Sequence, residues 1–181
     1  NTLCSIQAAL QAGVRAVEFD VQCSADGTAY VFHDEDLQRL TGQPGLIYQH
    51  TDSQLQQLSA HYPQRFAQQF LGEPICTLQA MVALLNKYPE VEGFIEPKSH
   101  SIEHFGIAPL MDAILRESAC LGERRRIISF RQGALAYARQ PGLGKQGCDN
   151  IVWVIRDFST DTANIARDLQ ANTLCVNVKL L

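Results

Sequence analysis

The sequence has few of the features that mark extracellular, membrane or zinc-binding proteins. Its six cysteines form no Cys-x-x-Cys pair, and in a chain of 181 residues we interpret them as reduced, mostly buried thiols. No apolar run approaches the roughly 18 residues of a membrane span, and no signal peptide is present. We therefore expect no stable membrane insertion and favour a cytoplasmic location. A periplasmic or secreted protein stays open, because the chain starts at Asn1 without an initiator Met.

A basic excess and the glycine-rich loops of nucleotide-binding proteins are also missing. The net charge is −4, so we expect no nucleic acid as a partner. Arg124-Arg125-Arg126 is the one basic cluster, and we interpret it as a solvated helix end rather than a phosphate-binding patch. No Gly-x-Gly-x-x-Gly or Walker motif follows a strand-like segment, which disfavours an open nucleotide-binding sheet.

What the chain has is an alternation of strand-like and helix-like segments around one core. Hydrophobic residues make up 46% of the chain, which is enough for one sizeable domain. Apolar patterns predict strands at residues 14–21, 28–32, 91–96, 126–130, 151–155 and 173–178. They predict helices near residues 2–13, 77–88, 108–118, 133–139 and 162–170. Residues 35–74 are polar and irregular, and form either a functional excursion or a loosely ordered insertion.

This alternation predicts a parallel sheet covered by helices. A closed (β/α) barrel and an open doubly wound sheet both fit it. About six predicted strands are fewer than the eight of a complete barrel, so either the sheet is open or two strands lie outside this sequence.

Two acids, Glu18 and Asp20, lie near the end of the first predicted strand. A period of two places both carboxylates on one face, whereas Val17, Phe19 and Val21 take the other. Two neighbouring buried carboxylates repel each other unless a cation compensates them. We interpret the pair as ligands of a divalent metal ion, and the alternative is a polar strand face in solvent.

His33 and Asp34 end the next apolar strand. An imidazole there can serve as general acid or base, because its pKa lies near neutral pH. We expect His33 at the same end of the sheet as the two acids. Asp34 either orients the imidazole or caps the following segment. The alternative is a structural histidine bonded to a neighbouring carbonyl.

Glu96 and Lys98 share a face at the end of the predicted strand 91–96, with Pro97 marking where the ladder stops. They form either a plain ion pair, or a third metal ligand beside an ammonium for a phosphate. Three strand ends thus offer acids, an imidazole and an amine, which predicts a site. The remaining histidines, at positions 50, 61, 100 and 104, we interpret as surface residues.

These motifs resemble those of the glycerophosphodiester phosphodiesterase family. The resemblance covers most of the chain in the family's order, and Cys76 stands where that family usually has proline. The segments that carry it are Asn1-Thr-Leu, Val17-Glu-Phe-Asp-Val21, Asp26-Gly27, Val31-Phe-His-Asp34, Ile75-Cys-Thr-Leu78, Ile95-Glu-Pro-Lys98 and Ile127-Ile-Ser-Phe130.

The resemblance implies a fold, a site and a reaction. The fold is a (β/α)8 TIM barrel, with residues 1–181 as one domain and residues 35–74 as the family's insertion. Glu18, Asp20 and Glu96 would coordinate one divalent cation, Ca²⁺ or Mg²⁺. His33 and Lys98 would be catalytic, and Lys98 and Asp34 would contact the substrate. The reaction is metal-dependent hydrolysis of a small-molecule glycerophosphodiester to glycerol 3-phosphate and an alcohol.

Two departures from the family pattern concern the ends of the chain. The family begins with a strand ending His-Arg-Gly, and its last strand carries Trp-Thr-x-Asn; neither is present. We therefore expect a fragment without the first and last barrel strands, inactive alone for want of one histidine. The alternatives are an inactive barrel that binds phosphodiesters or a protein partner, and a related lysolipid or sphingomyelin phosphodiesterase. The sequence shows no exposed apolar stretch that favours a lipid substrate, and it leaves the oligomeric state open.

Overall fold

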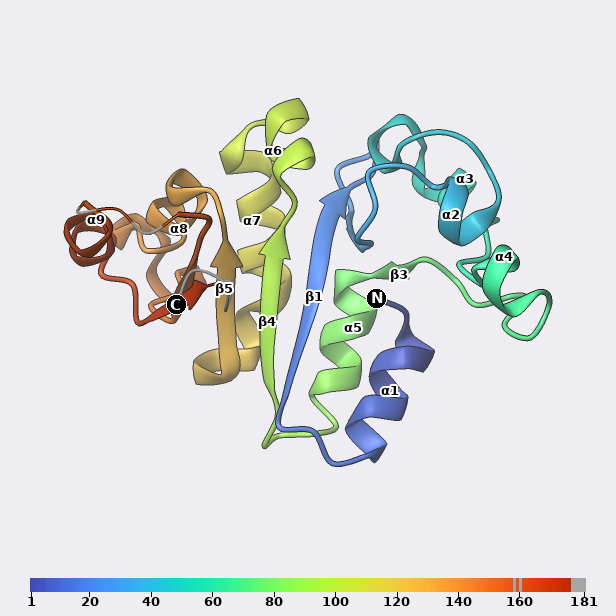
Figure 1. Ribbon diagram of the computed structural model, residues 1–181, viewed down its shortest axis with the longest axis horizontal. Helices are drawn as coiled ribbons and strands as arrows, with labels where there is room; N and C mark the ends of the chain where they lie inside the picture. Colours follow the sequence, from blue (N-terminus) through green and yellow to red (C-terminus); the bar gives the residue numbers. More distant parts are fainter. Residues whose placement is uncertain (158, 160, 177–181) are drawn as a thin grey trace.

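The computed structural model describes residues 1–157, 159 and 161–176. Figure 1 shows a twisted sheet with helices packed along it and an excursion of the chain at one edge. The sheet has seven strands in the order β3-β2-β1-β4-β5-β6-β7. Their bounds are β1 Ala16–Cys23, β2 Ala29–Val31, β3 Cys76–Thr77, β4 Glu92–Pro97, β5 Arg125–Ser129, β6 Ile151–Ile155 and β7 Thr173–Val176.

All six predicted strands are present, with ends that differ by one or two residues; positions 177 and 178 of the last lie outside the described residues. The sequence missed β3, which is too short for a pattern. Strands β1, β4, β5, β6 and β7 pair in parallel, as predicted. Strand β2 is antiparallel to β1 and to β3, which corrects the expectation of a uniformly parallel sheet. The Ser24–Thr28 turn is too short for the crossover that parallel pairing requires.

The long helices confirm the predicted ones. The hydroxyl of Thr2 accepts from the backbone N–H of Ser5 at the start of α1, and that of Thr77 accepts from Ala80 at the start of α5. The sequence missed α6, whose few apolar residues give a weak helical pattern. Bounds are α1 Leu3–Gln11, α5 Leu78–Leu85, α6 Ser99–Phe105, α7 Ile107–Ser118, α8 Gln132–Ala138 and α9 Thr162–Asp168, with 3₁₀ turns η2 Ala119–Arg124 and η3 Pro141–Gln146.

One face of the sheet makes the main core. Helices α1, α5, α7 and α8 lie side by side in sequence order (Figure 1), and apolar strand residues pack beneath them. Val17, Phe19 and Val21 are all buried, as the period-two pattern predicted. The acids between them therefore take the opposite face.

Residues 35–74 form an ordered excursion and not the loosely ordered insertion that the sequence offered as one alternative. A second small core anchors it to the sheet through Tyr30 and Phe32. The Asp52 carboxylate accepts from the hydroxyls of Ser24 and Thr28, both at 2.6 Å, and so ties the excursion to the β1–β2 turn. Its elements are α2 Gln38–Thr41, η1 Ile47–Gln49, α3 Asp52–Leu55 and α4 Pro63–Phe66.

The basic cluster is structural, although it is not the solvated helix end that the sequence predicted. The guanidinium of Arg125 is buried and donates to the carbonyls of Leu115, Gln146 and Gly147. Arg124 donates to the carbonyls of Leu85, the last residue of α5, and of Tyr88 and Val91 beyond it. Arg126 pairs with Glu92, 2.8 Å from Nε to Oε2. Each side chain thus joins neighbouring segments instead of forming one patch.

All six cysteines are free, as predicted, but only half are buried. Cys4, Cys120 and Cys175 are exposed, which corrects the expectation of mostly buried thiols. Among the described residues, no helix combines the length and apolarity that a membrane span requires.

Candidate active site

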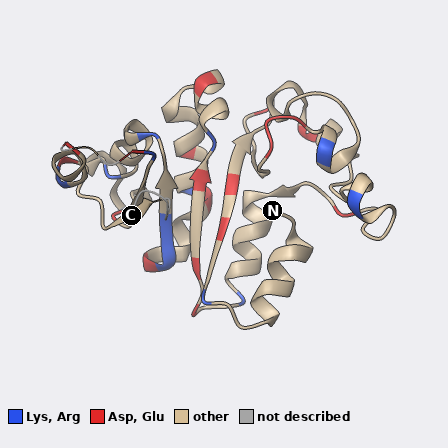
Figure 2. Cartoon of the chain, viewed as in Figure 1, with Lys and Arg blue, Asp and Glu red and all other residues tan. Residues whose placement is uncertain are grey.

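Three carboxylates meet on the face of the sheet that the core helices leave open. Asp20 on β1 and Glu96 on β4 are register partners, and Glu18 precedes Asp20 by the two residues that keep it on the same face. Oxygens of all three lie within 4.8 Å of one another. Acidic segments lie on these two adjacent strands in Figure 2. The prediction that these acids come together is confirmed.

The crowding of charge changes the acidity of this cluster. Partial burial, followed by repulsion from Asp20 and Glu96, raises the pKa of Glu18 to about 7, although part of its side chain stays open to solvent. Burial also raises the pKa of Glu96, and Lys98 opposes that rise. The protein alone therefore leaves negative charge partly uncompensated at this point.

Lys98 is the one cation of the chain that contacts the cluster within the described residues. Its Nζ lies 3.0 Å from Asp20 Oδ1 and 3.5 Å from Glu96 Oε1. Burial lowers the pKa of Lys98, but Asp20 and Glu96 outweigh burial, so the net pKa is raised and the ammonium stays charged. One ammonium against three carboxylates leaves room for a divalent cation, whose preferred ligands are such oxygens.

His33 reaches the same region through the β1–β2 hairpin. We expected it at the same end of the sheet as the acids, and it arrives there because β2 runs back antiparallel along β1. The backbone N–H of Phe32 donates to the carbonyl of Asp20 at 2.9 Å. The hairpin therefore returns His33 to the level of the carboxylates, and leaves its ring exposed.

A chain of hydrogen bonds holds the imidazole. Nδ1 of His33 lies 2.9 Å from Asp34 Oδ1. Arg39 grips the same carboxylate with two bonds, from Nε to Oδ2 at 2.6 Å and from a terminal nitrogen to Oδ1 at 2.7 Å. These bonds lower the pKa of Asp34, with Arg39 as the main cause. Of the roles predicted for Asp34, these bonds favour orienting the imidazole over capping the next segment, and its contact with the substrate stays a prediction.

Two residues of the site were not recognised from the sequence. Gln22 is buried and donates from Nε2 to the carbonyls of Phe32 and Asp34, at 2.9 and 2.7 Å, so it fixes the backbone on both sides of His33. Continuing the period-two run from Glu18 and Asp20 would have found it. Asn1 donates from Nδ2 to Asp20 Oδ2 at 2.8 Å. No pattern signals this contact, because only folding brings α1 beside β1.

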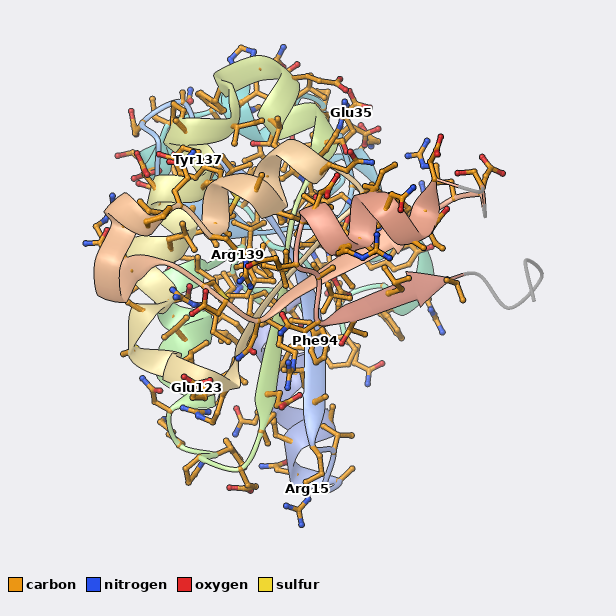
Figure 3. All side chains as sticks on the ribbon, turned by 90° about the vertical axis from the view of Figure 1, so that its left-hand side faces the viewer. Arg15, Glu35, Phe94, Glu123, Tyr137 and Arg139 are labelled. Carbon is orange, nitrogen blue, oxygen red and sulfur yellow. The ribbon has the colours of Figure 1, made fainter. Side chains whose placement is uncertain are left out.

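His100 also differs from its predicted place on the surface. It is half-buried near the start of α6, and its Nε2 is enclosed without a hydrogen-bond partner among the described residues. Burial lowers its pKa, Glu35 opposes that effect, and Lys98 and His33 add to it. In Figure 3 Glu35 lies at the same end of the molecule as α6, whereas Phe94 lies further down β4.

Comparison with known proteins gives consistent matches. The model of the Glycerophosphoryl diester phosphodiesterase family matches residues 1–142. A Glycerophosphodiester phosphodiesterase of Caldanaerobacter subterraneus is 30% identical over 135 residues, which are 75% of this chain and 54% of that protein. The Bacillus subtilis enzyme of that name is 27% identical over 77% of this chain and 50% of its own. The chain spans about half the length of these curated relatives.

Solved structures agree on the fold. An Oleispira antarctica phosphodiesterase, in complex with the product sn-glycerol-3-phosphate, superposes with a TM-score of 0.84 at 24% identity, over 100% of this chain and 70% of that one. A glycerophosphodiester phosphodiesterase from Thermotoga maritima gives 0.68 at 24% identity, over 97% and 66%. The predicted (β/α) barrel architecture is thus confirmed, with a sheet that is not closed over the described residues.

Proposed function

This chain belongs to the glycerophosphoryl diester phosphodiesterase family, and we propose that it carries the metal-dependent site that hydrolyses glycerophosphodiesters to glycerol 3-phosphate and an alcohol. The observation that carries the proposal is the cluster of Glu18, Asp20 and Glu96 with Lys98 in contact. The sn-glycerol-3-phosphate held by the Oleispira antarctica relative is the product this reaction requires. In this proposal residues 1–181 are one domain, with residues 35–74 as its insertion.

The three carboxylates would hold one Ca²⁺ or Mg²⁺ ion. Their chemistry fits either ion, because all three offer hard oxygen ligands and the ammonium alone leaves them under-compensated. When bound, the ion would offset negative charge developing on a phosphate oxygen.

The side chains around the carboxylates have separate tasks. The Lys98 ammonium lies beside the cluster, where it would pair with a second non-bridging phosphate oxygen. With Nδ1–H donating to Asp34, the Nε2 of His33 is free to exchange a proton with the substrate. The attacking hydroxyl gives up its proton and forms a new P–O bond as the P–O bond to the alcohol breaks, and the departing alcohol oxygen takes a proton. If water attacks, the products are glycerol 3-phosphate and the alcohol. If the hydroxyl of the adjacent glycerol carbon attacks, a cyclic glycerol phosphate forms first, and water then opens it to glycerol 3-phosphate.

The role of His33 can be tested by removing its imidazole. In the complete protein, His33→Ala should lower kcat/KM for a glycerophosphodiester by about 100-fold or more, since a general acid–base group contributes about that much. Turnover of glycerophosphocholine would be followed with Mg²⁺ or Ca²⁺ present, and again with a chelator.

His104→Ala is the matched control, because it removes an exposed imidazole that stacks on Tyr48 away from the carboxylates. His104→Ala should retain full activity. The circular dichroism spectra of His104→Ala and His33→Ala should be the same. Equal activity of His33→Ala and the unmodified protein would refute the role given to His33.

A further inference from the structure

A cavity lies beside the candidate catalytic histidine, His33, which forms part of its lining. It has a volume of about 450 Å³ and lies between α1 and the excursion of residues 35–74. This volume is within the range of about 300–1,000 Å³ typical of small-molecule sites. Its apolar wall, here called the apolar pocket, is made by Ala8, Leu40, Ala60, Tyr62, Phe66 and Phe70.

The aromatic rings of the apolar pocket pack edge to face. The centroids of Tyr62 and Phe66 are 6.1 Å apart, and those of Phe66 and Phe70 are 5.1 Å apart. Two guanidinium groups already lie near ring faces: Arg39 is 4.9 Å from the centre of Tyr62, and Arg65 is 5.1 Å from that of Phe66. A further cation would meet these occupied faces and two positive charges, against one lining carboxylate, Glu73, which already accepts from the backbone N–H of Cys4. The pocket is therefore unsuited to a quaternary ammonium and suited to an uncharged apolar group.

The cavity borders the His33 side of the candidate active site, and Asn1, whose amide donates to Asp20, also lines it. His33 and Arg39 both line it, and Arg39 is the residue that grips Asp34 behind the imidazole. A substrate whose phosphate lies at the carboxylates and whose ester oxygen meets His33 can thus extend into this cavity.

We propose that the apolar pocket binds a hydrocarbon chain carried by the phosphodiester substrate. The inference deepens the proposed function and rests on it, since it places the substrate between the carboxylates and His33. The chain could be an acyl group on the glycerol or an alkyl group on the leaving alcohol, and both offer the same apolar surface. The inference also revises the expectation from sequence that no apolar surface favours a lipid, because the wall comes from residues far apart in the chain.

Cys4 gives a readout that needs no turnover. It is exposed, it lines the cavity, and Cys120 is an exposed cysteine outside it. Alkylation by iodoacetamide would be followed at each cysteine by peptide mass spectrometry. Octanoyl-glycerophosphocholine and the octyl diester of glycerol phosphate, tested separately, should slow alkylation of Cys4 and leave Cys120 unchanged. The arm that protects Cys4 identifies which end of the substrate carries the chain.

Chain length provides the quantitative test. Each buried methylene contributes about 0.8 kcal/mol, so the dissociation constant should fall about fourfold per added carbon from hexanoyl to decanoyl chains. A flat dependence would overturn the proposal. So would equal protection of Cys4 by tetramethylammonium, or a Cys4 that resists alkylation in the ligand-free protein, since the cavity would then prefer a cation or be filled already.

Two substitutions on α1 distinguish binding in the cavity from binding elsewhere on the molecule. Ala8→Trp adds bulk from an exposed helix position that lines the cavity, whereas Gln7→Trp adds it at an exposed neighbour that does not. Ala8→Trp should weaken binding of the octanoyl lipid at least tenfold, and Gln7→Trp should leave it unchanged. Equal binding by both variants would contradict the proposal. Binding that fits these expectations without metal-dependent hydrolysis would retain the apolar pocket and reject the proposed function.

Discussion

At the scale of single residues, burial and mutual repulsion both disfavour the charged forms of the clustered carboxylates. The Asp20 carboxylate has two partners, the Asn1 amide and the Lys98 ammonium. Within the described residues, the Glu18 carboxylate has no hydrogen-bond or ion-pair partner, and its pKa rises to about 7. The least supported carboxylate is therefore the one whose protonation most depends on a bound cation.

The raised pKa of Glu18 predicts how metal-free stability depends on pH. The folded value of about 7 lies above the ordinary value of 4.5, so the folded chain binds more protons between these values than the unfolded chain does. The free energy of unfolding should therefore fall as pH rises from about 4.5 to about 7. Urea unfolding in the presence of a chelator would measure it.

Glu18→Gln should flatten that dependence, because the amide does not titrate. Glu90→Gln alters an exposed glutamate outside the cluster and should leave the dependence as it was. If Glu18→Gln and the unmodified chain lose the same stability over this pH range, repulsion within the cluster is not its cause.

At the scale of elements, the β1–β2 hairpin is what assembles the site. Its short turn reverses the chain, and the antiparallel register returns His33 to the level of Asp20. Gln22 in β1 then holds the backbone on either side of His33. The excursion supplies Arg39 and is fastened to the same turn through Asp52. One hairpin and one insertion thus position the whole His33 side of the site.

The buried Arg125 gives an element-scale prediction about stability. Its guanidinium joins β5 to the end of α7 and to the 3₁₀ turn η3 by donating to three carbonyls. Arg125→Leu should lower the free energy of unfolding by about 3 kcal/mol, because buried carbonyls lose their donors. Arg116 is exposed, so Arg116→Leu should change stability by less than about 0.5 kcal/mol.

Chemical denaturation of both variants at neutral pH would test this difference. If Arg125→Leu lowers the free energy of unfolding no more than Arg116→Leu does, the structural role given to Arg125 is wrong, and the solvated role predicted from the sequence is favoured.

At the scale of the whole molecule, the sheet separates stability from chemistry. Its helix-covered face carries the main core, and its other face carries the carboxylates of β1 and β4. A cation that binds this second face only in the folded chain must stabilise the entire fold by mass action.

Divalent cations should therefore raise the melting temperature, and a chelator should reverse the effect. At a concentration about 100 times the dissociation constant, the gain is about 2.7 kcal/mol. Asp20→Asn should abolish most of this gain, whereas Asp168→Asn, an exposed change on α9, should keep it. Thermal scans with Ca²⁺ and with Mg²⁺ would measure both, and an equal response of the two variants would argue against the carboxylate cluster as the binding site.

The sequence by itself determined most of the helices and strands and the acidic residues of the candidate site. Period-two alternation fixes which face of β1 bears Glu18 and Asp20, and the apolar stripe and Thr77 cap fix α5, because both depend on local backbone geometry. The same alternation at the end of the predicted strand 91–96 placed Glu96 and Lys98 on one face.

Only the tertiary structure decided which distant groups meet. Several features join residues far apart in the chain. They are the antiparallel strand that brings His33 beside the carboxylates, the contact of Asn1 with Asp20, the different segments that Arg124, Arg125 and Arg126 contact, and the apolar pocket. Local patterns carry no information on such contacts, because they depend on how whole elements pack. The carboxylates were thus readable from the chain, whereas their supporting side chains and the neighbouring cavity were not.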